Sequence, residues 1–198
     1  MRTADAGGWN GKWMEAGARA NAKNLKALSL AVLLVAVSVW PAKANADSNG
    51  TSEYEVKAAF LFHFAQFVEW PAETFLSAES PLTYCTVGED AFRGALDESV
   101  KGKRIGNRPL RVLHLREREP ISGCHVLFIG AAQKGRQTEE LASANGRPIL
   151  TVGETADFAQ EGGIIGFLLE EKKVRFEINV GAAEKAGLKI SAKLLALA

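Results

Sequence analysis

Apolar and polar residues recur with two different periods along this chain, and each change of period marks a new element. Between residues 53 and 69 the apolar positions are spaced by three or four, which predicts a helix with one core-facing stripe. Trp70-Pro71 ends this helix, because a proline disfavours helical backbone in the residue before it. The stripe consists of Val56, Phe60, Phe64 and Phe67.

Short apolar runs then alternate with helical segments. The runs at 82–87, 110–115, 125–130 and 148–152 have the length of strands, and the run at 125–130 is apolar enough to be buried on both faces. Helices are expected between them, at residues 90–99, 133–144 and 155–160. This alternation is typical of a mostly parallel sheet covered by helices.

The last 37 residues show a different pattern. Gly162-Gly163 forms a tight turn, and two strands at 164–169 and 173–180 are joined by only three residues, which predicts an antiparallel hairpin. Short helices follow at 182–186 and 192–197, the second capped by Ser191. We therefore predict an α/β fold: a single-domain sandwich with a mixed, mostly parallel sheet flanked by helices and a C-terminal β-hairpin.

The N-terminal segment has the composition of an export signal. Lys23 and Lys26 precede an apolar run of 14 residues, Ala27–Trp40, which is shorter than the ~20 residues needed to cross a bilayer. Small residues then offer cleavage after Ala44 or Ala46. We interpret residues 1–46 as a signal peptide, with an uncleaved membrane anchor as the alternative, and residues 47–198 as the mature extracytoplasmic domain.

Removing the signal changes the charge of the protein. Six of the 24 basic residues but only two of the 23 acidic ones precede residue 47, so 18 basic and 21 acidic residues remain, with a net charge of −3. This balance gives no attraction for nucleic acid.

Cys85 and Cys124 are the only cysteines of the chain. In an oxidising compartment such a pair predicts a disulfide, either as a structural staple or as a redox switch. A metal site is the weakest alternative, because no His/Cys set with metal-ligand spacing surrounds either residue.

Catalytic motifs are missing from the sequence. The histidines His63, His114 and His125 each fall in or beside a helix or strand, and no HExxH, GxSxG or Walker-type loop occurs. Seven basic residues between 101 and 118 could hold an anion, but interspersed glutamates favour a solvated loop. We expect no catalytic residue, no metal and no cofactor.

One strand offers a candidate contact surface. Strand alternation places Arg175, Glu177 and Asn179 on the face opposite Phe176 and Ile178. An exposed edge strand explains this pattern, and a partner-binding or ligand-binding patch is the functional alternative.

Several long collinear segments resemble the YfiR family. They include residues 54–61 (YEVKAAFL), 67–71 (FVEWP), 149–154 (ILTVGE), 174–179 (VRFEIN) and 190–195 (ISAKLL). The resemblance spans essentially the whole mature chain. Cys85 and Cys124 match a disulfide pair of relatives, whereas a further pair of some relatives, nearer the C-terminus, has no counterpart here.

The resemblance implies a periplasmic regulator and not an enzyme. Family members are thought to bind the periplasmic sensor domain of an inner-membrane diguanylate cyclase and keep it inactive, which lowers cyclic di-GMP signalling and biofilm formation. It also implies a homodimer and a releasing protein associated with the outer membrane. The alternatives from other classes are a periplasmic small-molecule-binding or sensor module and a secreted hydrolase.

Overall fold

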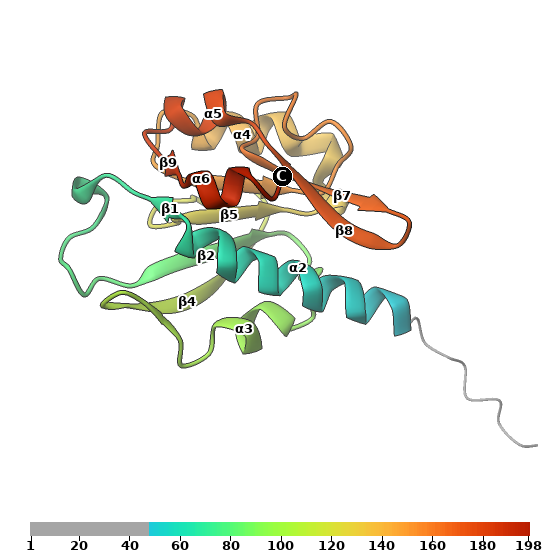
Figure 1. Ribbon diagram of the computed structural model, residues 1–198, viewed down its shortest axis with the longest axis horizontal. Helices are drawn as coiled ribbons and strands as arrows, with labels where there is room; N and C mark the ends of the chain where they lie inside the picture. Colours follow the sequence, from blue (N-terminus) through green and yellow to red (C-terminus); the bar gives the residue numbers. More distant parts are fainter. Residues whose placement is uncertain (1–47) are drawn as a thin grey trace, which may run out of the picture. The chain divides into compact units, whose positions relative to one another are not determined.

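The computed structural model describes residues 48–198, so the predicted signal peptide lies outside the described residues and stays a prediction. Helices, short 3-10 segments (η) and strands alternate along this part of the chain (Figure 1). In chain order they are α2 (Ser48–Gln66), β1 (Val68–Glu69), η1 (Ala72–Thr74), β2 (Leu82–Val87), α3 (Ala95–Val100), β3 (Arg104–Ile105), β4 (Arg108–Leu115), β5 (Val126–Ile129), η2 (Ala131–Arg136), α4 (Gln137–Ala144), β6 (Leu150–Gly153), β7 (Ile165–Glu170), β8 (Lys173–Ile178), α5 (Val180–Lys185), β9 (Lys189–Ile190) and α6 (Ala192–Leu195).

The main sheet has the strand order β3-β4-β2-β5-β6-β7-β8. The five central strands are parallel, whereas β3 and β8 pair antiparallel at the two edges. In the order of the sheet, the central strands are β4, β2, β5, β6 and β7. The predicted hairpin is formed by β7 and β8, which pair from Ile165↔Ile178 to Glu170↔Lys173. The mixed, mostly parallel α/β fold is therefore confirmed.

Strand alternation divides the interior into two cores. On β5, Val126 and Phe128 face a core that α2 and α3 cover, and Leu127 and Ile129 face a second core under α4. All four residues are at most 2% exposed, which explains why this strand is apolar throughout. Figure 1 shows α2 and α3 on one side of the sheet and α4 on the other.

Helix α2 buries a different face from the one predicted. Phe64 is fully buried, but it shares the core with Ala58, Leu61 and Ala65, whereas Val56 is 41% exposed. The small alanines let the helix approach α3 closely, and the Ser99 hydroxyl donates to the Ala58 carbonyl. The aromatic stripe was therefore only partly a core stripe.

The end of α2 also differs from the prediction. The helix stops at Gln66, and Val68–Glu69 pairs antiparallel with Lys189–Ile190 near the C-terminus. The Ser191 N–H donates to the Phe67 carbonyl and extends this tie. A strand of two residues has no periodicity of its own, so local pattern alone could not distinguish it from the last turn of a helix.

The segment expected to be a helix at 155–160 is a series of turns. It wraps Phe158, which is fully buried, between two glycines. A Cβ added to Gly153 or Gly163 would collide with the Phe158 ring. The Gly162-Gly163 turn thus provides the close backbone packing that its sequence predicted.

The helices expected at 90–99 and 133–144 are shorter than predicted. Asp90 accepts hydrogen bonds from the Phe92 and Gly94 N–H groups, and α3 begins only at Ala95, because Arg93 and Gly94 adopt positive φ. Likewise α4 begins at Gln137, after the 3-10 segment η2.

Candidate partner interface

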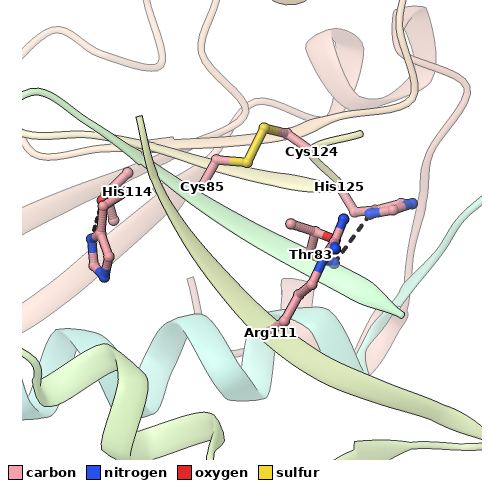
Figure 2. The surroundings of a disulfide bond; sticks show 7 residues. Thr83, Cys85, Arg111, His114, Cys124 and His125 are labelled. Carbon is pink, nitrogen blue, oxygen red and sulfur yellow. Dashed lines mark hydrogen bonds between the residues drawn. A yellow bond between two sulfur atoms is a disulfide. The ribbon is translucent and has the colours of Figure 1, made fainter. Parts of the chain in front are cut away.

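The two cysteines form the predicted disulfide (Figure 2). Cys85 lies in the centre of β2, Cys124 lies two residues before the start of β5, and their Cα atoms are 5.8 Å apart. Both residues lie in the second core and are at most 5% exposed. Such burial shields the bond from external thiols and favours the structural role over the redox switch.

His125, next to the disulfide, holds the loop that follows η1. Its ring stacks on Phe75 with a centroid separation of 4.6 Å, and the Arg108 guanidinium lies 3.5 Å from the centroid of the Phe75 ring. The Nδ1 atom accepts a hydrogen bond of 3.1 Å from the Thr83 N–H, and Figure 2 shows His125 beside Thr83 and Arg111. The ring thus links the loop to strand β2, which contains Thr83, so His125 has a packing role.

The other two histidines are more exposed. On β4, His114 lies between the Thr86 hydroxyl and the Asp97 carboxylate, at 2.9 and 3.0 Å. His63 contacts the Gln66 side chain on the exposed surface of α2. The order Thr86–His114–Asp97 has the form of a nucleophile, base and carboxylate, but Thr86 is only 2% exposed, so its hydroxyl is hidden from a substrate.

The structure places the three residues of the predicted contact surface in different environments. Arg175 is exposed on β8, the edge strand of the sheet. Glu177 is half-buried against Gly166 and accepts from the Gln160 amide at 3.2 Å. Asn179 caps α5 by accepting from the Ala182 N–H and donates to the Ala159 carbonyl. Of the three side chains, Arg175 is the most available to a partner.

An apolar groove lies beside this edge, between α2 and the turn of the β7–β8 hairpin. We call it the hairpin groove, and its volume is about 520 Å³. Leu169, 57% exposed, and Val56 belong to its walls. The whole lining is Glu53, Val56, Phe60, Leu169, Lys172, Lys173 and Val174.

The hairpin groove explains why α2 carries more apolar residues than its buried face needs. Val56 and Phe60 belong to the predicted stripe, but they border the groove and are not fully buried. Sequence reasoning did not find this groove, because its two walls are more than 100 residues apart in the chain. The only sign of the groove in the sequence was that the apolar stripe of α2 contains more residues than the core-facing side of the helix needs.

A buried polar cluster at the carboxyl ends of β5 and β6 was also missed by sequence reasoning. The Lys57 ammonium lies 2.6 Å from the Glu154 carboxylate, and both side chains are at most 7% exposed. Glu154 also accepts from the Tyr54 hydroxyl at 3.0 Å and from the Ala131 N–H at 2.8 Å. Burial, together with the Glu154 charge, raises the pKa of Tyr54 well above its usual value. The sequence signal was a lysine within the buried part of a helix.

Within residues 48–198, no group of three or more His, Cys, Asp or Glu side chains could hold a metal ion. The helices described in this range are also all too short or too polar to cross a membrane.

The arrangement is therefore that of a disulfide-stapled α/β domain with an open sheet edge, and comparison with known families agrees with this description. The family model described as YfiR/HmsC-like matches residues 54–198. The chain belongs to the YfiR/HmsC-like family. Membership supports a regulatory role in the periplasm in general.

Proposed function

We propose that this protein binds the periplasmic sensor domain of an inner-membrane diguanylate cyclase and holds the cyclase inactive. Lower cyclic di-GMP synthesis and restrained biofilm formation follow from this inhibition. Family membership supports a periplasmic regulator, and the open edge of β8 beside the hairpin groove is the observation that supports binding to another protein.

The edge strand and the groove provide two complementary kinds of contact. An edge strand presents backbone N–H and C=O groups that can pair with an extended segment of a partner. The neighbouring groove can receive an apolar side chain from that segment, against Leu169 and Phe60. Charged residues of both signs flank this surface, because Lys172, Lys173 and Arg175 lie near the exposed Glu170 and Glu171, and this favours a partner surface that also carries both signs.

Repression follows from a difference in affinity. If the protein binds the inactive conformation of the cyclase more tightly than the active one, binding shifts the population toward the inactive state. A releasing protein associated with the outer membrane would compete for the same surface and restore activity. A homodimer would present two such surfaces to a dimeric cyclase.

The direct test measures cyclic di-GMP synthesis in membranes that contain the cognate cyclase, with increasing amounts of the purified processed protein. In Arg175→Glu/Leu169→Asp we expect half-maximal inhibition to require roughly tenfold more protein, since exposed interface residues are lost without loss of core packing. Arg147→Glu, an equal charge reversal at another exposed site, is the control and should inhibit like the wild type.

Two results would contradict the proposal in different ways. If the wild-type protein does not inhibit at all, repression of the cyclase is wrong. If the double variant inhibits as strongly as the wild type, repression stands but the hairpin groove is not the contact surface.

A further inference from the structure

A second cavity lies on the other side of the N-terminal half of α2. Its volume is about 770 Å³, within the range of small-molecule sites. It is bordered by Tyr54 and Glu55 of α2, by the segment 89–95 that follows β2, by Asp97 and Glu98 of α3, and by Ala132 after β5. It shares no lining residue with the hairpin groove.

The topology of the sheet explains why the cavity is there. From β2 the chain crosses through α3 to β4 on one side, and after β5 it continues through η2 and α4 to β6 on the other side. The connections that leave the carboxyl ends of β2 and β5 therefore diverge, which makes this point a topological switch. In open α/β sheets, ligands bind in the crevice outside the strands at such a switch point. We call this cavity the switch-point cavity.

The charge of its walls selects the kind of ligand. Five carboxylates and one basic residue, Arg93, border the cavity. Three of these carboxylates already have partners: Asp90 binds backbone N–H groups, Asp97 binds His114, and Glu98 binds Lys101. Glu55 and Glu89 are exposed and form no ion pair or side-chain hydrogen bond with the side chains described in residues 53–198. They are the two carboxylates available to a ligand.

The aromatic surface of the remaining wall comes from the partly exposed Tyr54, because Phe92 behind it is only 2% exposed. The Tyr54 ring meets Phe92 edge to face with centroids 5.5 Å apart, and Phe92 in turn packs on Phe128 in the core. A rigid aromatic wall suits an apolar body, and aromatic faces also attract cations. A bare metal ion does not fit, because the carboxylates of the described residues do not converge into a set of metal ligands.

We propose that the switch-point cavity binds a small organic amine, with the ammonium group between Glu55 and Glu89 and the apolar body against Tyr54. This binding is separate from the proposed repression of a cyclase, so each can fail without the other. The buried Lys57–Glu154 pair supports the site from behind by fixing α2 and Tyr54 against the end of β6.

Three probes of the same shape and different charge test the proposal by isothermal titration calorimetry on the processed chain. Phenethylamine is the cation, 3-phenylpropionate the anion and phenethyl alcohol the neutral compound, and Mg²⁺ is titrated separately. We expect phenethylamine to bind at one site and more tightly than the other two organic probes. In Glu55→Gln/Glu89→Gln its affinity should fall roughly tenfold, the effect of two partly solvated ion pairs.

Two further variants test whether binding depends on these two glutamates in particular and on the open cavity. Glu73→Gln/Glu79→Gln removes two exposed carboxylates from another segment and should bind phenethylamine like the wild type. Ala132→Phe keeps all the carboxylates but fills the cavity from an exposed position, and it should abolish binding.

The proposal is overturned by any of four results. These are no saturable binding of phenethylamine up to about 10 mM, equal binding of the anionic probe, unchanged affinity in Glu55→Gln/Glu89→Gln, or displacement of phenethylamine by Mg²⁺ at equal concentration. None of these results bears on cyclase inhibition, which is measured with no amine present.

Discussion

His125 shows how a single side chain can make this fold sensitive to pH. Burial, together with the nearby Arg108 and Arg111 guanidinium groups, lowers the pKa of His125 to about 4. The neutral ring accepts a hydrogen bond from the Thr83 N–H through Nδ1 and stacks on Phe75. A protonated ring could not accept this bond and would place a third positive charge beside two arginines.

We expect the free energy of unfolding to fall as the pH is lowered from about 6.5 to about 4. In this interval the unfolded chain, in which the pKa of His125 is ~6.5, takes up a proton that the folded protein excludes. The loss should be about 1–3 kcal/mol, because solvent screens part of the effect. Urea unfolding between pH 8 and pH 4 measures it.

His125→Asn is the informative variant, because the amide oxygen can accept from Thr83 without titrating. Its stability should be lower at pH 8 but should depend less on pH than that of the wild type. His63→Asn, at an exposed position of α2, should leave the pH dependence unchanged. If His125→Asn has the wild-type slope, other groups cause the pH dependence.

At the scale of elements, the Lys57–Glu154 pair fixes α2 against the carboxyl end of β6. Glu154 accepts from three donors, which are the Lys57 ammonium, the Tyr54 hydroxyl and the Ala131 N–H. Glu53 also pairs with the Lys57 ammonium, at 2.5 Å. These contacts place the helix between the hairpin groove and the switch-point cavity. The orientation of α2 therefore affects both proposed sites.

Lys57→Met should lower the free energy of unfolding by about 3–5 kcal/mol, because it leaves the Glu154 carboxylate buried without its counter-charge. Lys57→Met/Glu154→Gln should recover most of this loss, since a neutral amide can still accept from Tyr54 and Ala131. Chemical denaturation monitored by circular dichroism gives both values.

Lys101→Met is the matched control, because the Lys101–Glu98 pair is exposed. It should change stability by less than about 1 kcal/mol. An equally small effect of Lys57→Met would show that the buried pair does not hold α2 in place.

At the scale of the whole molecule, the disulfide joins β2 to the segment just before β5, its neighbour in the sheet. It closes a segment of sequence separation 39 that contains α3, β3 and β4. Because β2 and β5 are neighbouring strands in the middle of the sheet, the bond ties the centre of the sheet together within the second core. It also lies on the face of the sheet opposite α2, away from the hairpin groove.

Cys85→Ala/Cys124→Ala should lower the free energy of unfolding by about 4 kcal/mol, the loop-entropy value for a segment of this length. Reduction of the wild-type protein should have the same effect on urea unfolding. If the folded variant still inhibits the cyclase at low temperature, the bond acts through stability. Full stability with lost inhibition would instead make the disulfide a redox switch.

Local pattern predicted the regular elements best and the short ones worst. The strands β2, β4, β5, β6, β7 and β8 all lie within a few residues of the expected runs, because a buried strand needs an apolar sequence. The two-residue strands β1, β3 and β9 were not predicted, since their pairing depends on a distant segment. The segment 155–160 failed as a helix because the buried Phe158 ring determines its path.

The sequence by itself determined the class of fold, the hairpin and the disulfide, because each depends on local pattern or on the presence of only two cysteines. Only the tertiary structure decided which face of α2 is buried, where Glu154 finds its counter-charge and where the two cavities lie. Those features join residues that are distant in the chain, such as Val56 with Leu169 and Tyr54 with Glu154. The order of strands brings them together, and neither strand order nor helix orientation is encoded in the period of apolar residues.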